Sequence, residues 1–181
     1  MNTWFWYLTR STGIVAAMLA VASLVWGLFF SARNTGTRLK PNWWLALHNW
    51  LGGLTFAFIG LHMLVSFLDT DAGLRFIDLF LPSNTVGWAI GWGVVAFWLF
   101  ALVTIPSMAR IRRRLPRRAW HLVHLLAIPA TVLTAVHAYQ AGSDSLSASF
   151  TRGLALLVGI AIYPVSIRLI GLAQRRRPLA A

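Results

Sequence analysis

Residues 47–62 read LHNWLGGLTFAFIGLH, an apolar stretch with a histidine near each end and no charged residue between them. The stretch lies in an apolar run from about Trp43 to Leu68, which is long enough to cross a bilayer as one helix. A second stretch, residues 120–137, reads WHLVHLLAIPATVLTAVH and holds His124 and His137 in a similar setting. Ionisable side chains are costly inside a membrane, so these histidines are the candidate functional residues.

The composition predicts an all-α integral membrane protein. Hydrophobic residues make up 58% of the 181 residues, charged residues only 11%, and the mean hydropathy is +0.68. We expect one domain, residues 1–181, built as a bundle of about five transmembrane helices. The expected crossings run from about Tyr7 to Ala32, Trp43 to Leu68, Val86 to Met108, Ala119 to Gln140, and Arg152 to Ala173. Cysteine is absent from the sequence, which excludes thiolate ligation of a metal by this chain.

The net charge of +12 is distributed unevenly among the connections. Basic residues gather after the first crossing, after the third crossing and in the C-terminal tail: Arg33, Arg38 and Lys40; Arg110, Arg112, Arg113, Arg114, Arg117 and Arg118; Arg175, Arg176 and Arg177. The positive-inside rule therefore predicts a cell-membrane protein with an outside N-terminus and a cytoplasmic C-terminus. We expect the basic residues to meet anionic membrane lipid and not nucleic acid, because no nucleic-acid-binding module accompanies them.

This orientation assigns a depth to each histidine, because the second and fourth helices both run outward from the cytoplasm. His48 and His124 then lie near the inner side, and His62 and His137 near the outer side. Each depth-matched pair can give one iron two axial ligands from neighbouring helices. We therefore expect two six-coordinate haems, held between helices two and four.

The two histidine spacings place the second histidine at different angles around a helix. His62 follows His48 by 14 residues, which returns it to within about 40° of the same helix face. His137 follows His124 by 13 residues, which leaves the two about 140° apart on a straight helix. Pro129 lies between them and removes a backbone hydrogen bond, so we expect the fourth helix to be kinked there.

His121 is the rival to His124 as inner ligand. It lies one turn earlier, close to Arg118, where it could instead donate to a haem propionate or sit at the headgroup boundary. Packing or interfacial roles are the alternative for all the histidines. Four histidines at matched depths favour ligation over those roles.

The run from Leu47 to Gly52 followed by Leu61-His62, and the run from Trp120 to His124 followed by Val136-His137, resemble the ferric reductase-like transmembrane domain family. That superfamily includes ferric reductases, NADPH oxidases and the haem-binding subunit of a periplasmic methionine sulfoxide reductase. The resemblance implies that His48, His62, His124 and His137 are axial ligands of two b-type haems. It also favours His124 over His121, through the position of Trp120.

The resemblance further implies a membrane cytochrome that carries electrons from a flavoprotein reductase or quinol to an acceptor or redox enzyme at the outer face. Flavin and nicotinamide domains follow the membrane domain in many relatives, but this sequence has no GxGxxG fingerprint. We therefore expect an electron-transfer component of an oxidoreductase system that does not act on NAD(P)H by itself. The alternative is a haem-free membrane protein, either a structural or assembly subunit or a histidine-lined metal permease. A permease would normally add carboxylates or thiols, which the crossings lack.

Other residues receive secondary roles. Four arginines are placed where they could pair with haem propionates or anchor at the interface: Arg10, Arg33, Arg38 and Arg118. Three glycines, Gly52, Gly53 and Gly60, are expected to allow close helix packing or to leave room for a porphyrin. The segment from Leu74 to Leu81 is expected to form a short interfacial helix over the outer haem.

Overall fold

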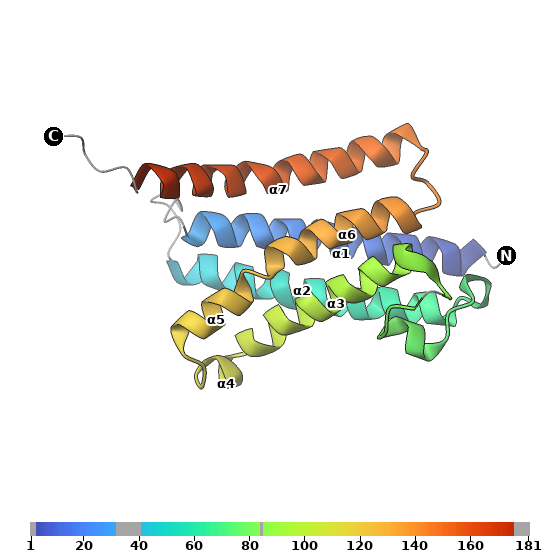
Figure 1. Ribbon diagram of the computed structural model, residues 1–181, viewed down its shortest axis with the longest axis horizontal. Helices are drawn as coiled ribbons and strands as arrows, with labels where there is room; N and C mark the ends of the chain where they lie inside the picture. Colours follow the sequence, from blue (N-terminus) through green and yellow to red (C-terminus); the bar gives the residue numbers. More distant parts are fainter. Residues whose placement is uncertain (1–2, 32–40, 84, 176–181) are drawn as a thin grey trace.

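The structure is a computed structural model that describes residues 3–31, 41–83 and 85–175. It contains helices and no strand within these ranges (Figure 1). The helices are α1 (Thr3–Ser31), α2 (Pro41–Leu68), η1 (Thr70–Ala72), η2 (Phe76–Leu79), α3 (Gly87–Ser107), α4 (Ala109–Arg112), α5 (Arg117–His124), α6 (Ala127–Ala141) and α7 (Ala148–Arg175).

Five helical segments in the described part of the chain are long and apolar enough to cross a membrane. They are Thr3–Ser31, Asn42–Leu68, Gly87–Ser107, Arg117–Ala141 and Ala148–Gly171, and the fourth combines α5 with α6. The five predicted crossings are therefore confirmed to within a few residues. The protein is an all-α, multi-pass membrane protein.

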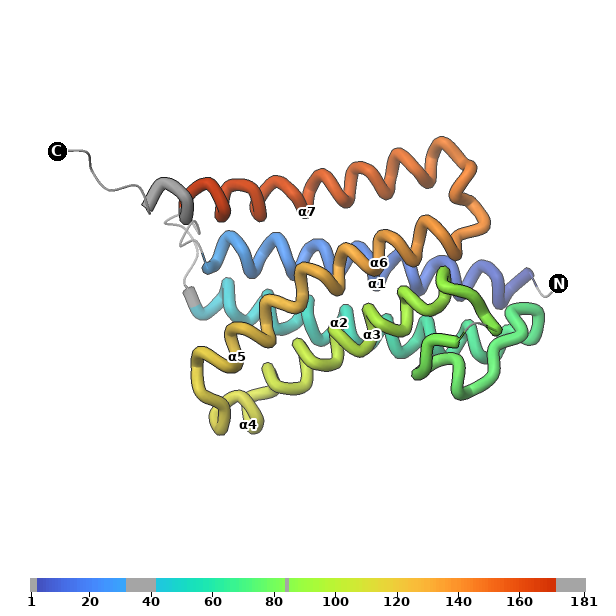
Figure 2. The backbone as a smooth tube through the Cα atoms, viewed as in Figure 1, coloured from blue at the N-terminus to red at the C-terminus, as the bar shows by residue number. Residues whose placement is uncertain are grey.

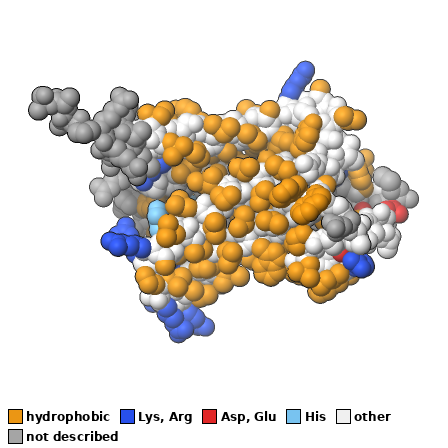
Figure 3. Space-filling model, in the orientation of Figure 1, with side chains coloured by type: hydrophobic (Ala, Val, Ile, Leu, Met, Phe, Trp, Pro, Cys, Tyr) orange, Lys and Arg blue, Asp and Glu red, His pale blue; other side chains and the backbone are white. Residues whose placement is uncertain are grey.

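Charged side chains mark the two ends of the bundle, and hydrophobic side chains cover the visible face between them (Figure 3). We call one end the basic end, because it carries the arginines of α4, α5 and their connection: Arg110, Arg112, Arg113, Arg114, Arg117 and Arg118. We call the other the acidic end, because all four acidic residues of the sequence lie in the connections there: Asp69, Asp71, Asp78 and Asp144. The remaining residues of the predicted basic clusters, Arg33, Arg38, Lys40, Arg175, Arg176 and Arg177, lie outside the side chains that the structure describes.

The helices associate mainly as two antiparallel pairs (Figure 2). α1 is the main packing partner of α2, and α3 is the main partner of α6, while α7 packs against α1. A small apolar core joins these elements near the middle of the bundle, formed by Ala20, Phe100 and Ala130 with Phe56, Ile59 and Leu99 against them. α2 packs chiefly on α1, and α6 packs chiefly on α3. Side chains of α2 and α6 can therefore project toward each other between the two pairs.

The fourth crossing is interrupted where the sequence predicted a kink. α5 ends at His124 and α6 begins at Ala127, with a turn at the two residues between. Pro129 has no N–H to offer the carbonyl of Leu125, which accepts instead from Ile128 N at 3.1 Å. Pro129 therefore occupies the first turn of a new helix, where its missing N–H costs nothing.

The connection between α2 and α3 folds around a buried carboxylate. Asp78, whose side chain is 1% exposed, accepts hydrogen bonds from the main-chain N, Nε and Nη2 of Arg75 at 2.9–3.0 Å. Ser83 Oγ donates to it at 3.0 Å. The Arg75 hydrogen bonds lower the pKa of Asp78 well below its usual range, against the opposing effect of burial. The structure thus corrects the expectation of a helix over residues 74–81. Only Phe76–Leu79 is helical, as a 3-10 turn shaped by this network.

Candidate functional site

The four predicted histidines meet as two facing pairs. The imidazoles of His48 on α2 and His124 on α5 have centroids 5.8 Å apart, with their planes at 73°. Those of His62 on α2 and His137 on α6 have centroids 6.1 Å apart, with their planes at 74°. The first is the basic-end pair and the second the acidic-end pair. The structure thus brings together the residues that depth matching paired.

Three of the four histidines make the same kind of hydrogen bond through Nδ1. In each, Nδ1 donates to a main-chain carbonyl oxygen of a neighbouring helix: His48 to Ser23 at 3.1 Å, His62 to Thr9 at 2.9 Å, and His137 to Ala89 at 2.7 Å. A carbonyl oxygen only accepts, so Nδ1 carries the proton and Nε2 keeps its lone pair. This is the tautomer that a metal-ligating imidazole requires when it binds through Nε2.

A glycine lies beside each of these three carbonyl contacts, four residues further along the same helix. A Cβ added at the glycine would reach the imidazole ring: Gly13 meets His62 at 3.0 Å, Gly27 meets His48 at 2.9 Å, and Gly93 meets His137 at 2.8 Å. We call each pairing of a carbonyl and a glycine a carbonyl-glycine cradle. The absence of a side chain lets the ring approach the helix closely enough to donate. Sequence reasoning assigned this role to none of the three glycines, although each follows its carbonyl residue by four positions.

His124 is held differently from the other three. Its Nδ1 contacts Ser107 Oγ at 3.3 Å. That hydroxyl donates to Val103 O at 2.6 Å and accepts from Trp120 Nε1 at 3.2 Å, so His124 is the donor in its contact. The Trp120 ring stacks on His124 at 4.7 Å and 21°, and the Arg112 guanidinium lies 4.2 Å from the Trp120 centroid. Ring stacking and a side-chain hydroxyl thus replace the cradle at this position.

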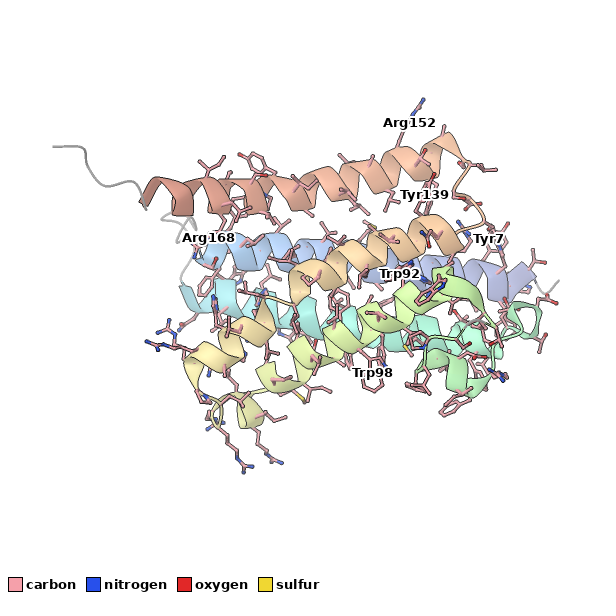
Figure 4. The ribbon with its side chains drawn as sticks, in the orientation of Figure 1. Tyr7, Trp92, Trp98, Tyr139, Arg152 and Arg168 are labelled. Atoms are coloured by element: carbon pink, nitrogen blue, oxygen red, sulfur yellow. The ribbon has the colours of Figure 1, made fainter. Side chains whose placement is uncertain are left out.

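A cavity of about 330 Å³ surrounds the acidic-end pair. Helices α1, α2, α3 and α6 line it together with the connection between α2 and α3, which contributes Leu74, Asp78 and Leu79. Figure 4 shows Trp98 on the side of α3 near this connection. Its Nε1 donates to Phe80 O at 2.8 Å and so ties the connection to α3. The segment expected to cover this site therefore does line it, although it is not an α-helix.

Arg10 lines the same cavity, but its guanidinium already has an acidic partner. It forms an ion pair with Asp144 and donates to Ser143 Oγ at 2.7 Å, both in the connection between α6 and α7. It also lies over the rings of Trp6 and Phe150, at 5.0 and 5.9 Å. The described contacts of Arg10 therefore join α1 to α7 and to the connection between α6 and α7.

The other predicted candidates take less central positions. His121 is exposed on α5 and does not face His48, and Arg118 is also exposed. A Cβ at Gly53 or Gly60 would have no atom within 4 Å. These two glycines are thus not sites of close helix packing, which corrects that expectation. Gly52 has one neighbour, Ser23 Oγ at 3.7 Å, and Arg33 and Arg38 lie outside the described residues.

A second cavity, of about 630 Å³, lies between α1, α6 and α7. Tyr139 lies at this boundary on α6, whereas Arg152 on α7 extends away from the bundle (Figure 4). Among the described residues that line the cavity there is no histidine. Neither histidine pair therefore lies at this second cavity.

The geometry of the pairs fits an iron porphyrin. Two iron–imidazole bonds of about 2 Å, plus the distance of about 1 Å from each nitrogen to its ring centre, place two axial imidazoles about 6 Å apart. The observed separations are 5.8 and 6.1 Å. Each site offers two imidazoles, and no group of three or more His, Asp or Glu residues that could hold a metal occurs in the described ranges. A porphyrin supplies the four remaining donors of an octahedral iron.

The fold and these pairs define a class: polytopic helical membrane proteins with facing histidines inside the membrane. The chain belongs to the ferric reductase like transmembrane component family, whose model matches residues 12–135. The matched stretch contains His48, His62 and His124 and stops just before His137. Domains of this family generally bind haem, and the membership makes the chain a membrane redox component. A comparison with curated proteins finds no match.

Proposed function

We propose that this protein is a b-type cytochrome that carries electrons from one face of the membrane to the other. His48 and His124 would ligate one haem, and His62 and His137 a second. The observation that carries the proposal is the pair of facing imidazole sets, each ring held through Nδ1 so that Nε2 remains free. A haem bound at each site would supply one-electron chemistry.

The chain itself would orient and insulate the two sites. Fourteen residues of α2 separate His48 from His62, which sets the sites about 20 Å apart along the helix axis. The apolar core around Phe100 lies between the two levels and excludes water from the intervening space. Such a low-dielectric sheath favours transfer between the sites over loss of the electron to solvent.

Charge supports an orientation for this transfer. The basic end carries six arginines on α4, α5 and their connection, which is typical of a cytoplasmic face. We propose that the N-terminus lies outside the cell membrane and the C-terminus inside. A flavoprotein reductase or quinol would then reduce the basic-end site, and an acceptor or redox enzyme would be reduced at the acidic end.

The test is a reduced-minus-oxidised spectrum of the purified, haem-replete protein, together with a haem-to-protein ratio. We expect a b-type difference spectrum and a ratio of two. In sealed vesicles that enclose ferricyanide, the protein should also pass electrons inward from dithionite added outside. A protein that purifies folded from haem-sufficient cells and shows no Soret shift on reduction would refute the proposal.

A further inference from the structure

Two buried side-chain polar atoms lack a hydrogen-bond partner within the part of the chain that the structure describes: Trp44 Nε1 and Thr9 Oγ1. Buried polar groups without partners are costly and therefore rare. Here one such atom occurs toward each end of the bundle, and each belongs to a residue beside one of the histidine pairs. This placement suggests that both atoms serve a ligand.

Trp44 lies one helical turn before His48, on the same face of α2. Its ring stacks on Trp26 at 4.2 Å and 27°, and Trp26 Nε1 donates to Trp44 O at 3.2 Å. These contacts fix the indole, so its own N–H cannot turn away to find another acceptor.

Trp120 provides an internal comparison. It lies one turn before His124, as Trp44 does before His48. The Trp120 N–H has an acceptor in the protein, Ser107 Oγ, whereas the Trp44 N–H has none. The two tryptophans thus take equivalent places on the two ligand helices, and only Trp44 still has a donor to offer.

Thr9 holds the corresponding place at the acidic-end pair. Its carbonyl accepts from His62, and the residue lines the cavity around that histidine. Neighbouring hydroxyls on α1 donate to carbonyls of the preceding turn, as Thr12 Oγ1 does to Leu8 O at 2.7 Å. Thr9 Oγ1 makes no such bond. Its nearest cation in the cavity lining, Arg10, is already paired with Asp144.

We propose that Trp44 Nε1 and Thr9 Oγ1 each donate a hydrogen bond to a carboxylate of a bound haem, Trp44 at the basic end and Thr9 at the acidic end. This inference rests on the proposed function. A porphyrin is otherwise apolar, and its propionates are the acceptors that a single buried donor fits best, because a bond to an ionised acceptor is stronger than one to a neutral group. The two donors would orient each haem with its carboxylates toward the nearer end of the bundle.

The test replaces each of the two residues by the residue of most similar shape that has no side-chain hydrogen-bond donor. Trp44→Phe keeps an aromatic ring against Trp26, and Trp43→Phe, at a neighbouring side chain that is 49% exposed, is its control. Thr9→Val keeps the branched shape and the carbonyl for His62. Ser11→Ala, which removes an exposed hydroxyl that donates to Leu8 O within α1 at 3.2 Å, is its control. The haem at the untouched end reports in each variant that the bundle is folded.

Haem loss to an excess of apomyoglobin and the resonance Raman bands of the propionates are measured for all four variants. We expect Trp44→Phe to release the basic-end haem, and Thr9→Val the acidic-end haem, about tenfold faster than their controls. Each should also shift the propionate bands of its own haem only. Variants that match their controls in both measurements would overturn the inference while leaving the proposed function intact. Failure of the unmodified protein to bind haem would overturn the proposed function itself.

Discussion

Gly93 lies directly beside the imidazole of His137, and a Cβ at this position would come within 2.8 Å of two ring atoms. The same imidazole donates to Ala89 O at 2.7 Å, one turn earlier on α3. The position of the ring is therefore set by α3 as much as by its own helix, α6.

Substitution of this glycine should disturb the acidic-end site selectively. We expect Gly93→Ala to weaken haem binding there by about tenfold or more, because overpacking by a methyl group costs about 1–3 kcal/mol. Titration of the purified apoprotein with haemin measures this affinity. Gly159→Ala, on α7, where an added Cβ meets nothing within 4 Å, should bind haem as the unmodified protein does. Equal affinities in the two variants would contradict the cradle.

Single histidine substitutions should group by the observed pairs. His48→Ala and His124→Ala should lose the same haem, and His62→Ala and His137→Ala the other, since each variant removes one axial ligand. His121→Ala should keep both, because His121 is exposed. Pyridine haemochrome counts and redox titration check the grouping. Loss of a haem in His121→Ala together with retention in His124→Ala would reverse the choice between these two residues.

Ser107 should tune the basic-end site. Ser107→Ala removes the acceptor of both His124 Nδ1 and Trp120 Nε1. We expect a weaker basic-end haem, by about 10–100-fold, and a changed midpoint potential at that haem alone. Ser107→Thr keeps the hydroxyl and should restore both properties. An unchanged potential in Ser107→Ala would show that the hydroxyl does not influence the ligand.

The break before Pro129 should be necessary for correct pairing. Pro129→Ala allows residue 129 to donate to Leu125 O, which favours a continuous helix. A continuous helix would turn His124 and His137 about 140° apart, so one haem should be lost or show altered low-spin EPR signals. Pro164→Ala, inside α7, serves as the control. Two unperturbed haems in Pro129→Ala would show that the packing of α5 and α6, not the proline, maintains the break.

The connection around Asp78 should lose stability in acid. Its pKa is lowered in the folded protein, chiefly by Arg75, so the folded state keeps a carboxylate that the unfolded chain protonates below about pH 4. The stabilisation is thus present above that pH and is lost as the pH falls toward the lower folded value. We expect the melting temperature to fall as the pH drops below about 4. Asp78→Asn should melt a few degrees lower at pH 7 and respond less to acid.

The sequence predicted the parts of this structure that depend on one helix at a time. The crossings follow from apolar length, the pairing of His48 with His124 follows from matched depth, and the break follows from the chemistry of Pro129. The carbonyl partners and the cradle glycines Gly13, Gly27 and Gly93 were not predicted, because they depend on which helix packs beside α2 or α6. Sequence periodicity shows that a face is buried but does not name the neighbour. Trp44 and Ser107 were missed for the same reason, since their importance depends on what each side chain does or does not contact.

The three carbonyl-glycine cradles have a consequence for how the cofactor would be loaded. They lie on α1 and α3, so contacts between neighbouring helices orient the imidazoles of α2 and α6 without the help of a ligand. The loss of side-chain entropy is then part of folding, and little further ordering remains to oppose cofactor capture. The bundle is in this sense preorganised. A chain inserted without haem should present the same imidazole geometry as a filled one, and late loading in the membrane should need no refolding.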